Sequence, residues 1–139
     1  MELVYITRKE HFNAAHRLFL PELSDEENLQ LFGKCSNPNW HGHNYTLHVT
    51  VKGEVSRKTG FVADLKELSN VINEKVIIKM DHRNVNLEVD FMAGKIASTE
   101  NMAIAIWKEL EPEVRKMNAA LHCVRIDETE KNSVEYYGE

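Results

Sequence analysis

Residues Cys35–Val51 read CSNPNWHGHNYTLHVTV. From Tyr45 to the end of this stretch apolar and polar residues alternate, which predicts a strand with one buried face. Two histidines separated by one glycine, His41 and His43, stand just before it. Side chains two residues apart on a strand lie on the same face, so both imidazoles can point at one position if the strand begins at this motif. The two histidines are therefore candidate metal ligands.

The residues around this motif fit a zinc site. Imidazole nitrogen suits Zn²⁺, which has three protein ligands in most catalytic sites and four in structural sites. His16 is a third candidate ligand, and the small residues Ala14 and Ala15 before it would let a metal or ligand approach closely. Cys35 precedes His41 by six residues, and the turn-forming residues between them allow the chain to fold back. Cys35 is therefore either a fourth ligand or a thiol beside the metal.

Two acidic residues are further candidates. Asp81 is followed by His82 in a polar segment, residues 81–86, that we expect to be a loop. A carboxylate beside an imidazole can orient the ring and stabilise its protonated form, so this pair is a candidate for proton transfer. Glu128 stands near the end of a predicted strand, where a carboxylate can accept two hydrogen bonds from a guanidine-like edge. From the residues alone, an acid exposed to solvent is the simpler interpretation of Glu128.

The other segments predict an α+β fold. Strands are expected at residues 3–15, 45–51, 121–129 and 134–137, with a hairpin turn between the last two. Capping patterns predict a short helix after Ser24 and two longer helices, after Asp64 and after Ser98 or Thr99. The main order is β-β-α-α-β-β. The tight final hairpin requires antiparallel pairing, so we predict an antiparallel four-stranded sheet with two helices on one face.

Composition bounds the class of protein. A chain of 139 residues, 42% hydrophobic and 28% charged, predicts a single domain over residues 1–139. The net charge of −5 argues against a nucleic-acid-binding surface. Two cysteines make no disulfide framework, no signal peptide is expected, and no apolar run is long enough to cross a bilayer. We therefore expect a soluble, cytoplasmic protein with neither nucleic acid nor membrane as a partner.

Four motifs follow one another along the chain: Phe12-x-Ala14-x-His16, Cys35-x5-His41-Gly42-His43, Asp81-His82 and Glu128-Thr129. In this order they resemble the 6-pyruvoyl-tetrahydropterin synthase family, and the resemblance covers nearly the whole chain. It implies the tunnelling fold (T-fold), in which three copies join their sheets into a barrel and two trimers stack. The implied assembly is a homohexamer, a dimer of trimers, with active sites at subunit interfaces.

The same resemblance implies a reaction and a role for each candidate residue. The reaction is the conversion of 7,8-dihydroneopterin triphosphate to 6-pyruvoyl-tetrahydropterin with loss of triphosphate, and it depends on Zn²⁺. The implied metal ligands are His16, His41 and His43. The implied catalytic residues are Cys35, which would remove a proton, and Asp81 and His82, which would handle protons on the other side. The implied substrate-binding residues are Glu128, as the anchor of the pterin, Thr99 and Glu100.

Two other functions stay open. A sister activity of the same fold makes 6-carboxy-tetrahydropterin for queuosine synthesis, but its members typically have three residues between the cysteine and H-G-H. Here five residues separate Cys35 from His41, which favours the pyruvoyl enzyme, although Trp40 stands where glycine is usual. The other alternative is a non-enzymatic zinc protein in which Cys35 completes a closed four-ligand site. That alternative leaves the acidic candidates unexplained.

Overall fold

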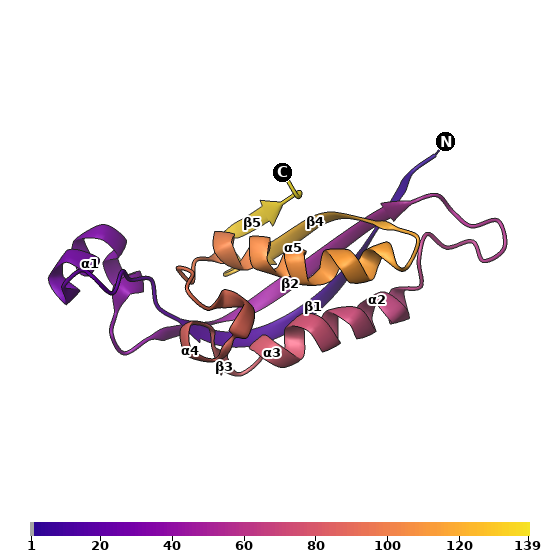
Figure 1. The fold of residues 1–139 in the computed structure, drawn as a ribbon. Coiled ribbons are helices and arrows are strands. Elements are labelled where there is room, and N and C mark those ends of the chain that lie inside the picture. Colours follow the sequence, from indigo (N-terminus) through magenta and orange to yellow (C-terminus); the bar gives the residue numbers. More distant parts are fainter. Residues whose placement is uncertain (1) are drawn as a thin grey trace.

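The computed structural model describes residues 2–139, which form one five-stranded sheet with its main helices on one face (Figure 1). The strand order in the sheet is β3-β1-β2-β4-β5. The strands are β1 (Val4–His16), β2 (His41–Gly53), β3 (Arg83–Asn84), β4 (Ala120–Asp127) and β5 (Ser133–Tyr136). The α-helices are α1 (Asp25–Phe32), α2 (Leu65–Ile72), α3 (Ile78–Met80), α4 (Val85–Glu88) and α5 (Thr99–Arg115). None of these helices is both long enough and apolar enough to cross a membrane.

The two longest strands form the centre of the sheet. β1 and β2 each have 13 residues and pair antiparallel along their whole length, from Val4 opposite Gly53 to His16 opposite His41. Alternate residues of β2 from Tyr45 onward are buried, so the predicted alternation is confirmed. β2 begins earlier than expected, because the H-G-H motif itself belongs to the strand. The paired strands therefore bring His16 and the motif to the same end of the sheet.

The helices α2 and α5 cover one face of the sheet, as predicted (Figure 1). Asp64 and Ser98 cap them, because each side-chain oxygen accepts a hydrogen bond from a backbone N–H in the first turn. Full burial of an aliphatic side chain stabilises a fold by about 1.5–3 kcal/mol, and both helices contribute several. The fully buried side chains include Leu68 and Ile72 of α2 and Met102, Ile106, Leu110 and Val114 of α5. The first turn of α5 is thereby fixed beside the sheet end that carries the histidines.

The α+β class is confirmed, but the predicted four-stranded antiparallel sheet is wrong in two respects. The sheet has a fifth strand, β3, and β3 runs parallel to β1, where it pairs with Ala14 and Ala15. The segment 81–86, expected to be a loop, contains this strand and the start of α4. A two-residue strand has no alternation that would reveal it. It lies against β1 because the backbone N–H of Asn13 donates to Asp81 Oδ1 at 2.8 Å.

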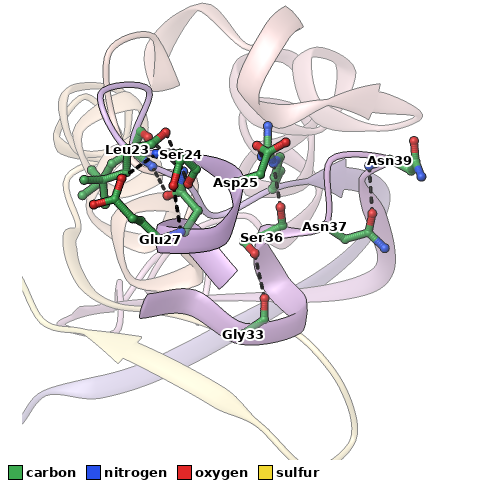
Figure 2. A network of polar contacts seen from close by, with 11 residues as sticks. Leu23, Ser24, Asp25, Glu27, Gly33, Ser36, Asn37 and Asn39 are labelled. Carbon is green, nitrogen blue, oxygen red and sulfur yellow. Dashed lines mark hydrogen bonds and ion pairs between the residues drawn. The ribbon is translucent and has the colours of Figure 1, made fainter. Parts of the chain in front are cut away.

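Some helical segments are not part of the predicted order. The helix after Asp64 continues through a π-helix, Asn73–Ile77, into α3. α1 lies at one end of the molecule, apart from the helix layer (Figure 1). Its predicted capping box is confirmed, because the Ser24 hydroxyl accepts from the N–H of Glu27 and the Glu27 carboxylate accepts from the N–H of Ser24 (Figure 2). This short helix leads directly into the segment that carries Cys35.

Candidate active site

The three histidines come together at one end of the sheet. His16, the last residue of β1, lies opposite His41, the first residue of β2, and His43 lies opposite Ala14. The ring centroids of His16 and His41 are 4.5 Å apart, and His43 lies 5.1–5.2 Å from both. A Cβ atom at Gly42 would lie 3.2 Å from the Ala14 carbonyl oxygen, so glycine lets the strands approach here. One ring nitrogen of each histidine lies within 4.8 Å of the others, which makes a triad that could bind a metal.

The protonation pattern of the triad fits a metal ion. His16 Nδ1 lies 2.7 Å from the backbone carbonyl oxygen of Ala97. A carbonyl can only accept, so Nδ1 carries the proton and Nε2 keeps a free lone pair. This Nε2 is buried without a hydrogen-bond partner, as is Nδ1 of His41. Burial lowers the pKa of both His16 and His41, so their rings are neutral, as metal ligation requires. The donor set, three imidazoles, suits zinc.

Glu128 lies beside the triad, one residue beyond the end of β4. Its Oε2 atom is 3.9 Å from His16 Nε2 and 4.0 Å from His43 Nε2. The same oxygen accepts a hydrogen bond of 2.7 Å from the hydroxyl of Thr99, the first residue of α5. The Glu128 side chain is only 25% exposed. Glu128 is therefore not an acid exposed to solvent, and its orientation is set by the helix that packs on the sheet.

Cys35 lines a hollow together with Glu128, although it belongs to another segment of the chain. A hollow of about 260 Å³ is lined by Leu18, Cys35, Ser98, Thr99, Glu100, Glu128, Asn132 and Val134. Cys35 belongs to a 3₁₀ turn, Gly33–Ser36, that follows α1. The turn is held because the Ser36 hydroxyl donates to the Gly33 carbonyl, and the N–H of Leu18 donates to the Cys35 carbonyl, each at 2.8 Å (Figure 2 shows the first of these). Four of the predicted site residues, Cys35, Thr99, Glu100 and Glu128, thus share one hollow.

Cys35 is not part of the triad. Within residues 2–139, the cluster whose ligand atoms all lie within 4.8 Å of one another contains the three histidines and no cysteine. A closed site with one cysteine and three histidines is therefore not formed by this arrangement. The fourth position of a tetrahedral ion bound to the triad would be open. This geometry favours a catalytic site over a structural one.

Asp81 and His82 lie elsewhere on the chain's surface. Asp81 Oδ2 is 3.0 Å from His82 Nδ1, and the His82 side chain is 81% exposed. The hydrogen bond from the backbone N–H of Asn13, with the contact to His82, lowers the pKa of Asp81. Asp81 lines a second hollow, with His11, Asn13, Asn44 and Thr46, on the face of the sheet that the helices leave open. Within one chain, the structure brings this pair together but does not bring it into the hollow that Cys35 lines.

Two residues of interest had no predicted role. Tyr45, two residues after His43, is fully buried, and its hydroxyl has no hydrogen-bond partner. Burial, with Glu128 and Cys35 nearby, raises the pKa of this tyrosine, so its hydroxyl stays protonated. The alternation predicts a buried side chain at this position but gives no signal about the hydroxyl. Trp40, beside His41, has a φ of +68°, which lies in the left-handed region that favours glycine.

Comparison with known proteins agrees with the motifs. The family model for 6-pyruvoyl tetrahydropterin synthase matches residues 5–139. The chain is 42% identical over 136 residues to the 6-pyruvoyl tetrahydrobiopterin synthase of Drosophila melanogaster, covering 98% of this chain and 80% of that one. The Homo sapiens enzyme of the same name is 43% identical over 134 residues, covering 96% and 91%. The solved structure of Caenorhabditis elegans 6-pyruvoyl tetrahydropterin synthase superposes with a TM-score of 0.92 at 40% identity, covering 100% and 98%. The T-fold is therefore confirmed, and the chain belongs to the 6-pyruvoyl tetrahydropterin synthase family.

Proposed function

We propose that this chain converts 7,8-dihydroneopterin triphosphate to 6-pyruvoyl-tetrahydropterin with release of triphosphate, as a zinc-dependent enzyme of tetrahydrobiopterin synthesis. The observation that carries the proposal is the shared hollow. It places a thiol, Cys35, and a held carboxylate, Glu128, around one space, with the histidine triad about 4 Å from that carboxylate. Relatives more than 40% identical over nearly the whole chain carry the corresponding name. This similarity and the five-residue spacing after Cys35 favour the pyruvoyl product over the 6-carboxy product.

The triad would hold Zn²⁺ through the three imidazoles. When bound, the ion would supply a Lewis acid that acidifies the hydroxyl groups of the substrate side chain and the C–H bonds next to them. His16 is 1% exposed and oriented by the Ala97 carbonyl, so its free nitrogen is held at a fixed position. Because the reducing equivalents would pass from the side chain to the ring of one molecule, the reaction is an internal redox rearrangement.

Inside the hollow, Glu128 would bind the pterin ring and Cys35 would remove a proton from the substrate. The Thr99 hydroxyl fixes one carboxylate oxygen of Glu128, and the carboxylate would accept the paired N–H donors of the pterin edge. Glu100, in the first turn of α5, would line the same pocket for the substrate. Cys35 would act as the base that removes a proton from the substrate side chain, since the thiolate is the reactive form of cysteine and a nearby cation favours it.

The Asp81–His82 pair would act on a substrate bound mainly by another copy. The pair is exposed at the sheet edge, beside β3, and lies outside the hollow of its own chain. Among the described residues, β1 pairs with β3 only at Ala14 and Ala15, and the backbone of Asn13 bonds to Asp81 and His82, so the edge of β1 from Val4 to Phe12 is open, and the outer edge of β5 is open too. Open edges favour pairing between copies. We propose that three copies join these edges into a barrel, that two trimers form a homohexamer, and that each active site lies at a subunit interface.

The two free thiols fit a cytoplasmic location.

The test is incubation of the zinc-loaded protein with 7,8-dihydroneopterin triphosphate, with pterin products resolved by mass and free triphosphate measured. The expected result is 6-pyruvoyl-tetrahydropterin with one triphosphate per product. The Cys35→Ala variant should keep its zinc and lose most of this activity. Cys123→Ala is the matched control, because Cys123 lies on β4 outside the hollow. A 6-carboxy product would assign the chain to the sister activity, and an unchanged substrate would refute an enzymatic role.

A further inference from the structure

Three buried side-chain polar atoms in residues 2–139 have no hydrogen-bond partner: His16 Nε2, His41 Nδ1 and Tyr45 Oη. All three belong to side chains on the same face and at the same end of the sheet. Two are ring nitrogens of the triad, and a metal ion would account for a free nitrogen there. The tyrosine hydroxyl is the one orphan atom that neither the metal nor the roles proposed above explain.

The surroundings of Tyr45 place its ring against the site. The ring stacks on Phe12, its partner across β1, at 4.8 Å, and meets the His43 and His16 rings edge-on at 5.5 and 6.1 Å. On the other side of β2, Thr46 pairs with Asp127 of β4. In an antiparallel pair, one step back along one strand corresponds to one step forward along the other. Tyr45 precedes Thr46 and Glu128 follows Asp127, so Glu128 is the neighbour of Tyr45. Tyr45 therefore lies between the stacked Phe12 and the carboxylate, next to the triad.

An unpartnered hydroxyl at this position is costly for the free protein. A buried hydroxyl without a partner destabilises a fold, whereas a phenylalanine of the same shape would avoid this cost. The stacking on Phe12 and the contacts with the histidine rings need only the aromatic ring. The hydroxyl is thus unexplained by packing, and an unsatisfied buried group of this kind calls for a partner that the isolated chain lacks.

We propose that Tyr45 Oη donates a hydrogen bond to an oxygen of the pterin side chain, and that Tyr45 thereby selects pterins with a hydroxylated side chain. The inference rests on the function proposed above and deepens it. Glu128 would hold the ring edge of the pterin, and the triad would lie next to the side chain. Tyr45 touches the triad with its ring and adjoins Glu128, so a ligand held by these two anchors would lie beside the tyrosine.

The test compares two non-reactive ligands. Neopterin carries a hydroxylated side chain, and 6-methylpterin has the same ring without these oxygens. For the zinc-loaded Tyr45→Phe variant, we expect neopterin binding to weaken about tenfold, the effect of one lost hydrogen bond, with 6-methylpterin binding within about twofold of wild type. Glu128→Gln should weaken both ligands. Tyr137→Phe is the matched control, because the Tyr137 hydroxyl donates to Glu135 away from the site, and it should weaken neither.

A second measurement separates a ligand-binding hydroxyl from a structural one. Without pterin, zinc-loaded Tyr45→Phe should have a melting temperature equal to or above that of wild type, because the variant removes an unpaired buried group. A lower melting temperature would show that the hydroxyl has a structural partner and would overturn the inference. Equal neopterin affinity in wild type and Tyr45→Phe, or equal losses for both ligands, would also overturn it. If the wild-type chain bound neither pterin, the proposed function would fall and this inference with it.

Discussion

The histidine triad and the Asp81–His82 pair are held by the fold in different ways. The triad lies at the end of two 13-residue strands in continuous register, and His16 is 1% exposed. The pair follows α3 and precedes a two-residue strand, and His82 is 81% exposed with a φ of +60°. Both groups were predicted from short motifs of similar length. Only the triad is held by long paired strands within one chain.

The difference indicates which part of the site one chain can complete. A metal site needs ligands held within a few tenths of an ångström, and paired central strands supply that rigidity. A proton-transfer group at a sheet edge can be ordered by a neighbouring copy, and the edge is where copies of a sheet protein join. The histidine triad, the metal half of the site, is thus expected to form in any folded chain. The Asp81–His82 pair, the proton-handling half, is expected to function only in the assembly.

The largest expected effect concerns the metal half. His16→Ala should reduce bound zinc from about one per chain to well below one and abolish turnover. Partners that only orient a ligand contribute about 10- to 100-fold to metal affinity, so removal of a ligand should cost at least that much. Metal content by elemental analysis is the measurement. His11→Ala is the control, because His11 lies on the same strand but on the open face. Full zinc occupancy in His16→Ala would remove this residue from the site.

The next effect tests whether the two halves meet between chains. Cys35→Ala and His82→Ala homo-oligomers should each be nearly inactive. When the two variants are unfolded, mixed in equal amounts and refolded, random assembly gives about a quarter of the sites an intact cysteine and an intact histidine from different chains. Pyruvoyl-forming activity should therefore return to about a quarter of the wild-type value. A mixture as inactive as its components would show that both residues of a site come from one chain.

A smaller effect is expected from the carboxylate that joins the triad to the hollow. Glu128→Gln keeps the shape, but presents a donor to the N–H groups of the pterin. Loss of such a paired, charge-assisted contact costs on the order of 2–5 kcal/mol. Pterin binding should weaken accordingly, with zinc content, thermal stability and oligomer size unchanged. Equal pterin affinity would move the anchor elsewhere, with Glu100 as the next candidate, and a loss of zinc would make Glu128 a metal ligand.

The same comparison explains what the sequence could predict. The triad could be predicted because strand periodicity puts His41 and His43 on one face, and because His16 was a further candidate ligand at the end of the first predicted strand. The contact between Thr99 and Glu128 was not, since the two residues are 29 positions apart and meet only through the packing of α5 on the sheet. The resemblance to a family implied substrate-binding roles for Thr99 and Glu128, whereas the sequence pattern alone did not.

Short or irregular features were the least predictable. β3 has two residues and lies beside hydrogen bonds that join Asn13 to Asp81 and His82, so no pattern in the sequence indicates it. The π-helix Asn73–Ile77 continues the helix after Asp64, and the apolar stripe of that helix does not indicate it. The unpartnered hydroxyl of Tyr45 is likewise a tertiary property, because alternation predicts burial of the ring and not the partner of its oxygen.

The smallest expected effect measures how firmly one chain holds the exposed pair. The pKa of Asp81 is lowered from its ordinary value of 3.8, first by the N–H of Asn13 and then by His82. A carboxyl whose pKa is lower in the folded than in the unfolded state stabilises the fold above its unfolded pKa, and this contribution is lost as the pH falls through the folded pKa.

Asp81→Asn removes the charge at every pH. Its stability deficit relative to wild type should therefore be present at pH 5 and shrink below pH 3.8. Because the side chain is 38% exposed, solvent screening keeps the deficit below about 1 kcal/mol. Denaturant unfolding of both proteins between pH 3 and pH 6 measures it, and a deficit that does not change over this range would show that the Asn13 contact does not stabilise the charged carboxylate.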